Sequence, residues 1–168
     1  LVRSRGLGDV YKRQVPGMTA ATAVASTVGA PLGHDFAVIS LSDRLKPWEL
    51  IERRIIAALD ADLVIAVYNP GSSARGWQVG ALKMLLLDRI SEDRVVVVGR
   101  DVGGPTQSVL TTTVGELDPA SVDMRTLLII GSSATTAVGR TAGALVYTCL
   151  LYTSDAADDS LRVHIGGC

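Results

Sequence analysis

The sequence lacks the residues that several classes of protein need. Only two of its 168 residues are cysteine, Cys149 and Cys168, so residues 15–142 cannot rely on disulfides. CxxC and HExxH motifs are missing, and His34 is the one histidine between residues 15 and 142, which leaves no common zinc-site pattern. No apolar run reaches the roughly 18 residues of a membrane span. We therefore expect neither a metal site nor a membrane role.

Excess charge and aromatic side chains are scarce as well. Sixteen Lys and Arg against seventeen Asp and Glu give a formal net charge of -1. Binding to the phosphate backbone of nucleic acid draws on a surplus of basic side chains. Nucleic acid is therefore not an expected partner. Aromatic residues make up 4% and hydrophobic residues 48%, which favours a core of small aliphatic side chains. Together with the lack of disulfides, this composition indicates a cytoplasmic α/β protein of about one domain.

Familiar catalytic motifs are also missing. A serine hydrolase of the α/β type would need GxSxG, and phosphoryl transfer would favour a Walker A loop; neither occurs. The GLGD at residues 6–9 follows no strand pattern, so we do not interpret it as a phosphate loop.

The two ends differ from the rest of the chain. Residues 1–14 are basic without an apolar segment, and residues 143–168 lose periodicity and contain the acidic run DAADD. VYKRQ and CLLYTSDAADD resemble translated sequencing adaptors. We expect both ends to be non-native segments that contribute little to the fold, an ordinary flexible tail being the alternative.

Between these ends, apolar segments alternate with amphipathic ones. We expect strands at residues 36–41, 63–68, 95–99, 109–114 and 127–131, and helices after residue 16, from about 47 to 59, and at 78–90. This alternation predicts an α/β fold, an open sheet with helices on its faces. The short connection between the last two strands predicts a mixed sheet.

Polar, turn-forming loops follow three of the expected strands. They are NPGSS after residue 68, RDVGGPTQ after residue 99 and GSSATT after residue 130. Ligands of open α/β sheets bind outside the carboxyl ends of the strands. The three loops are therefore the expected binding site.

Six segments resemble, in order and spacing, the tetrapyrrole (corrin/porphyrin) methylases, and especially the branch that methylates precorrins in cobalamin biosynthesis. They are PGMTA at 16–20, GAPLGHDFAVISLSD at 29–43, PWE at 47–49, VYNP at 67–70, GRDVGGPTQ at 99–107 and TTTVGELDPASVDMRTLLIIGSS at 111–133. The resemblance implies two α/β domains with S-adenosylmethionine in the cleft between them. Residues 15–32 would then be the end of the first domain and the linker, and residues 33–142 the C-terminal methylase domain.

The resemblance further implies a precorrin-type tetrapyrrole as substrate and a homodimer for the intact enzyme. The family's segments of the first domain that hold the cofactor have no counterpart here, so we expect the fragment alone to be inactive. Within the family, a uroporphyrinogen or other precorrin methylase and a ribosomal RNA methylase are the rival interpretations. A non-catalytic α/β module that packs against a partner is the rival from another class.

The resemblance also nominates site residues. It places cofactor contacts at Thr19, Ala20, Tyr68, Asn69 and, less closely, Gln107 and Gly131. Methylation with ring contraction requires proton transfers, for which the candidate catalytic residues are His34, Asp43, Arg100 and Asp101. The alternatives are that Thr19 caps a helix, Tyr68 is a core ring with its hydroxyl at the surface, Arg100 forms an ion pair and His34 hydrogen-bonds locally.

Overall fold

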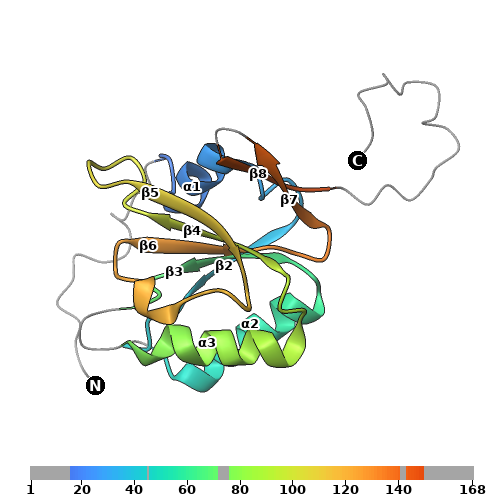
Figure 1. Ribbon diagram of the computed structural model, residues 1–168. Helices are drawn as coiled ribbons and strands as arrows, with labels where there is room; N and C mark the ends of the chain where they lie inside the picture. The colour runs from blue at the N-terminus through green and yellow to red at the C-terminus, as the bar shows by residue number, and fades with distance from the viewer. Residues whose placement is uncertain (1–15, 45, 72–75, 141–142, 150–168) are drawn as a thin grey trace, which may run out of the picture.

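The computed structural model describes residues 16–44, 46–71, 76–140 and 143–149, and its centre is a five-stranded sheet (Figure 1). The strands are β2 (Phe36–Ser40), β3 (Val64–Tyr68), β4 (Val95–Arg100), β5 (Ser108–Thr113) and β6 (Thr126–Ile130), in the order β2-β3-β6-β4-β5. β2 is parallel to β3, whereas β6 runs antiparallel to both β3 and β4, and β5 runs antiparallel to β4. The predicted mixed α/β sheet is therefore confirmed.

The central strands are buried on both faces. Successive side chains on a strand point to opposite sides, so neighbouring residues enter different cores. Ile65, Val67, Val96, Leu128 and Ile130 face one core, whereas Val64, Ala66, Val97, Leu127 and Ile129 face the other. Helices α2 (Trp48–Asp60) and α3 (Trp77–Arg89) cover the first face. Helix α1 (Ala20–Val28) covers part of the second face (Figure 1). The short 3-10 turn η2 (Pro119–Ser121) lies between β5 and β6.

Specific side chains fix the start of α1 and the packing of the three helices. Thr19 caps α1 through a capping box with Thr22. α1 then packs directly on β4 because residue 99 is glycine: a Cβ there would lie 2.3 Å from Cγ2 of Val24. At the other face, the rings of Trp48 and Trp77 meet edge to face with their centroids 4.8 Å apart, which joins the first turns of α2 and α3.

A second, three-stranded sheet lies on the α1 side of the molecule (Figure 1). It contains β1 (Gly29–Ala30), β7 (Thr135–Arg140) and β8 (Gly143–Thr148) in the order β1-β8-β7. β8 pairs on both sides, Val146 is fully buried, and the Thr148 hydroxyl donates to the Pro31 carbonyl at 2.7 Å. The expected boundary at residue 142 therefore separates two strands that pair with each other, and residues 143–148 belong to the fold. Residues 1–14 and 150–168 lie outside the described part, and the non-native origin of the ends stays a prediction.

None of the helices in the described ranges has the length and apolar character of a transmembrane span.

Candidate functional site

Two of the three predicted loops meet at one edge of the sheet. β3 and β4 are both antiparallel to β6, so they run in the same direction and their carboxyl ends lie at the same edge. The loop after β2 starts at this edge too, because β2 is parallel to β3, and β6 begins there. Residues 72–75, which include the two serines of NPGSS, lie outside the described residues.

The third loop, GSSATT, lies at the opposite edge, so this part of the expectation is wrong. Because β6 runs antiparallel, Gly131 comes beside the beginning of β4, where its N–H donates to the Val95 carbonyl at 2.9 Å. A Cβ on Gly131 would lie 2.6 Å from Cβ of Thr135. Gly131 therefore serves the packing of its own turn and lies far from the other predicted cofactor residues.

His34 is also separated from the other candidates. It precedes β2, at the amino end of that strand, whereas the remaining candidates gather at the carboxyl ends. Its Nδ1 accepts a 2.6 Å hydrogen bond from the N–H of Asp35, which is the local role considered as the alternative. Asp43 lies in the loop after β2, at the edge where β3 and β4 end.

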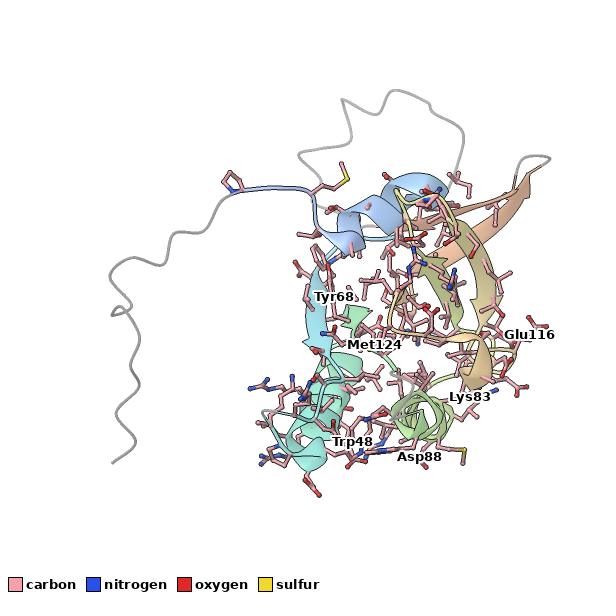
Figure 2. All side chains as sticks on the ribbon, turned by 90° about the vertical axis from the view of Figure 1, so that its left-hand side faces the viewer. Trp48, Tyr68, Lys83, Asp88, Glu116 and Met124 are labelled. Carbon is pink, nitrogen blue, oxygen red and sulfur yellow. The ribbon has the colours of Figure 1, made fainter. Side chains whose placement is uncertain are left out.

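The end of β3 is held against α1. Tyr68 points toward the start of α1 (Figure 2), and its hydroxyl accepts a 2.9 Å hydrogen bond from the N–H of Ala21. This hydroxyl satisfies one of the N–H groups that a helix start leaves without an intrahelical partner. Thr19 satisfies another, because its Oγ1 accepts from the N–H of Thr22 at 3.3 Å.

Asn69 turns the chain directly after β3. Its φ of 50° lies in the left-handed region, which asparagine tolerates better than most side chains. Its Nδ2 donates to the Ser40 hydroxyl at 2.9 Å, and the Leu41 N–H donates to the Tyr68 carbonyl at 2.9 Å. These two bonds fix the ends of β2 and β3 relative to each other.

The loop after β4 is organised around Asp101. This carboxylate accepts from the Thr106 hydroxyl at 2.5 Å and from the Thr106 N–H at 3.0 Å, and it pairs with the guanidinium of Arg125 at 2.5 Å. The hydrogen bonds from Thr106, followed by Arg125, lower the pKa of Asp101. Gln107 closes the same loop, since its Oε1 accepts from the Gly103 N–H at 2.8 Å.

Arg100 forms the ion pair considered as its alternative role. Its Nε donates to Asp123 at 2.9 Å, and the other oxygen of Asp123 accepts from the Thr126 hydroxyl at 2.8 Å. Partial burial alone would raise the pKa of Asp123, but the bonds from Thr126 and Arg100 outweigh it and lower the pKa. Both Arg100 and Asp101 are thus engaged in holding loops at this edge.

The described residues of this edge enclose adjoining hollows, which we call the strand-end groove. The central hollow, of about 320 Å³, is lined among others by Ala20, Tyr68, Asn69, Gly99, Asp101 and Thr126. A second hollow continues past Ala20 and Val102 to Thr19 and Gln107. Five of the six predicted cofactor residues therefore line one groove: Thr19, Ala20, Tyr68, Asn69 and Gln107.

Sequence interpretation missed the residues just before and at the start of β6. Met124, Arg125 and Thr126 line the central hollow, and Figure 2 places Met124 between Tyr68 and the helices α2 and α3. The sequence places this segment within the family-like stretch at 111–133 but gives it no site residue. The expected mixed sheet was the one signal that could have placed these residues at the site, because an antiparallel strand begins where its neighbours end.

A mixed α/β sheet with a groove built from a helix start and two strand-end loops is an arrangement typical of small-molecule-binding proteins of the α/β class. Residues 9–118 match the family of Tetrapyrrole (Corrin/Porphyrin) Methylases. The match covers more than half of the chain, and the chain belongs to this family. It includes residues 9–14, which were predicted to be adaptor-derived.

Individual relatives agree with the family. The chain is 58% identical over 130 residues to the cobalamin biosynthesis protein CobIJ of Mycobacterium tuberculosis, covering 75% of this chain and 26% of that protein. It is 49% identical over 138 residues to the precorrin-3B C(17)-methyltransferase of Sinorhizobium, covering 82% and 54%. The solved structure of the methyltransferase CobJ superposes with a TM-score of 0.76 at 39% identity, covering 82% of this chain and 56% of that one. The chain thus spans only about a quarter to about half of the length of these relatives.

Proposed function

We propose that this chain is part of an S-adenosylmethionine-dependent C-methyltransferase of cobalamin biosynthesis. It would convert precorrin-3B to precorrin-4, with methylation at C-17 and ring contraction, as a homodimer in the cytoplasm. The observation that carries the proposal is the convergence of Thr19, Ala20, Tyr68, Asn69 and Gln107 on one groove. The name of the Sinorhizobium relative supplies the substrate and the position of methylation.

The groove suits a ligand that is partly polar and partly apolar, as S-adenosylmethionine is. Its central hollow of about 320 Å³ lies at the lower end of the roughly 300–1,000 Å³ typical of small-molecule sites. Small apolar side chains of Ala20 and Val24 line it beside the polar Asn69 and Thr126. Ala20 would let a nucleoside approach the start of α1 closely, and Asn69 would offer hydrogen bonds from the end of β3.

The reaction asks for positioning more than for side-chain chemistry. S-adenosylmethionine, when bound, supplies a methyl group made electrophilic by its sulfonium, and the electron-rich tetrapyrrole carbon is the nucleophile. Orienting two reactants can contribute roughly 7 to 11 kcal/mol of the barrier. Here the Asp101 loop and the Tyr68 contact with α1 would hold the walls of the groove in place. Among the proton-transfer candidates, His34 lies at the other edge, whereas Asp43, Arg100 and Asp101 lie at the edge of the groove and remain the proposed acids or bases.

The test compares this chain alone with the same chain joined to the N-terminal half of the Sinorhizobium relative. Calorimetric titration with S-adenosylmethionine should show binding to the joined protein and about a hundredfold weaker binding to the chain alone, because the chain spans about half of the length of that relative. The joined protein should methylate precorrin-3B. Absence of both binding and methylation in a folded joined protein would overturn the proposal.

A matched pair of variants locates the site in the joined protein. Asn69→Ala should weaken cofactor binding by about tenfold, the value of one good hydrogen bond. His34→Ala, at the opposite edge, should leave binding unchanged. A loss at His34 that equals the loss at Asn69 would contradict the strand-end groove as the site.

A further inference from the structure

Gln78 is a buried polar side chain with no assigned role. The residue is only 3% exposed, and its Oε1 has no hydrogen-bond partner within the described part of the chain. Buried polar groups are normally paired, because leaving one unpaired costs stability. Gln78 therefore marks a place where a group from outside the described fold would complete the structure.

The side chain of Gln78 lines a third hollow at the strand-end groove. Asn69 and Met124 line both this hollow and the central one, and Figure 2 shows Met124 on the side of Tyr68 that faces α2 and α3. Ser42 and Arg44 also line the third hollow. A ligand in the central hollow can thus reach it by extending past Asn69.

The chemistry of this hollow favours an anion. Among its described lining side chains, Arg44 is a cation and Ser42, Asn69 and Gln78 can all donate hydrogen bonds, while none is acidic. Rotating the Gln78 carboxamide by half a turn would replace its oxygen with the NH2 group, so the buried group can donate as well. The acidic Asp43 is in the same loop as Arg44 but is not among the lining residues.

The start of α3 adds to this preference. Gln78 is the second residue of a 13-residue helix, and the N-cap, Gly76, supplies no side-chain hydrogen bond to it. The first backbone N–H groups of a helix lack intrahelical partners, and the helix dipole makes this end positive. A helix start and an unpaired buried carboxamide therefore converge on the same hollow.

We infer that this hollow is a carboxylate-binding subsite, in which Gln78, Ser42 and Arg44 bind a carboxylate of the ligand in the strand-end groove. The inference rests on the proposed function for the source of that carboxylate. It belongs either to an acid side chain of the tetrapyrrole or to the methionine part of S-adenosylmethionine. The chemistry recognised is the same in both cases.

The experiment uses the full chain and two pairs of probes. Uroporphyrin I, which carries eight carboxylates, is compared with tetra(N-methylpyridyl)porphyrin, which carries none. S-adenosylhomocysteine is compared with 5′-methylthioadenosine, which lacks the amino-acid carboxylate. Each probe is titrated, to millimolar concentration where soluble, into the unaltered chain and the variants Gln78→Leu, Arg44→Met and Arg53→Met. Arg53 is an exposed arginine on α2 outside the hollow, so its variant controls for the loss of one positive charge.

The expected result is a loss of about tenfold or more in affinity for one carboxylate probe in both Gln78→Leu and Arg44→Met. Its partner without the carboxylate and the Arg53→Met variant should show no such loss. If the affinity falls for uroporphyrin I, the carboxylate belongs to the tetrapyrrole. If it falls for S-adenosylhomocysteine, the carboxylate belongs to the cofactor.

Stability separates a binding role from a structural one. Gln78→Leu removes an unpaired buried polar group, so its thermal midpoint should be equal to or above that of the unaltered chain. Four outcomes would each overturn the inference. Two concern the variants: a lower thermal midpoint of Gln78→Leu, or unchanged affinities for the carboxylate probes. The other two are an equal loss of affinity for a probe without a carboxylate, and failure of the unaltered chain to bind either carboxylate probe. None of these outcomes depends on methyl transfer, so failure of the proposed function remains distinguishable.

Discussion

The phenol oxygen of Tyr68 and the backbone N–H of Ala21 are joined by a 2.9 Å hydrogen bond. This bond links the end of β3 to the first turn of α1, across 47 positions in the sequence. Residues at the end of β3 and at the start of α1 both line the central hollow. The position of α1 over the groove therefore depends in part on one hydroxyl.

Removing that hydroxyl should loosen the first turn of α1. Tyr68→Phe leaves the Ala21 N–H without its partner while keeping the ring, so we expect a loss of about 1 kcal/mol in the free energy of unfolding. Urea denaturation followed by circular dichroism measures it. Tyr147→Phe is the matched control, because Tyr147 on β8 is also partly buried and its hydroxyl has no hydrogen bond within the described residues. Equal stability of Tyr68→Phe and the unaltered chain would contradict the structural role of the bond.

Gly99 should not tolerate a side chain. Its Cβ would lie 2.3 Å from Cγ2 of Val24, so Gly99→Ala should cost about 1 to 3 kcal/mol through overpacking between α1 and β4. Combining it with Val24→Ala should cost less than the sum of the two single changes, because the smaller residue makes room.

The control for this change is Gly80→Ala. Gly80 lies in α3 with open space around it, so alanine there should raise stability by about 0.5 to 1 kcal/mol. Thermal denaturation of all four variants gives the comparison. Simple additivity of Gly99→Ala and Val24→Ala would contradict the contact.

Asp62, which lies at the edge opposite the groove, should make the free energy of unfolding depend on pH. Its carboxylate accepts from the hydroxyl and N–H of Ser133 and from Arg94. Partial burial alone would raise the pKa of Asp62, but these contacts outweigh it and lower the pKa below the ordinary 3.8. A lowered folded pKa means that the stabilisation is present above pH 3.8 and is lost as pH falls through the folded value.

Asp62→Asn should therefore be less stable than the unaltered chain at pH 7, by about 1 kcal/mol. The difference should shrink as pH falls below the ordinary value of the carboxyl. Asp93→Asn serves as the control, since Asp93 is exposed and its carboxylate has no hydrogen bond in the described structure. A difference that is constant from pH 7 to pH 2 would exclude this linkage. Urea denaturation across that range measures it.

Two truncations test whether β8 belongs to the folded unit. Ending the chain after residue 142 removes β8 and with it the fully buried Val146, whereas ending it after residue 149 keeps both. The shorter chain should be less stable by at least about 2 kcal/mol, the cost of losing one buried aliphatic side chain and its pairing. Equal thermal midpoints of the two truncated chains would support the boundary predicted from composition.

Most of the central sheet could be predicted from the sequence, because buried strands contain recognisable apolar runs. LVIAVY at 63–68 and VVVVG at 95–99 appear in the structure as β3 and β4, shifted by one residue at most. The helices at 48–60 and 77–89 follow from the spacing of Ile51, Ile55, Leu82 and Leu86, which are fully buried. In the two helices, periodicity reports which residues are buried, because each helix buries one well-defined side.

The site was less accessible because strand direction has no local signature. The placement of Gly131 at the wrong edge came from assuming that the loop after β6 joins those after β3 and β4. Whether β6 runs parallel or antiparallel is decided by its pairing with strands distant in sequence. β8 was missed for a related reason, since GALVYT pairs with two partners but alternates only weakly between buried and exposed residues.

The position of β6 also bears on the order in which the sheet can form. β6 lies between β3 and β4, yet it is the last strand of this sheet along the chain. Until residues 126–130 have been synthesised, β2 with β3 and β4 with β5 can form only as two separate pairs with exposed apolar edges. Such distant pairings are slow to form, and their partly formed states are prone to associate. A chaperone that acts on this protein during synthesis would therefore be needed most before β6 emerges from the ribosome.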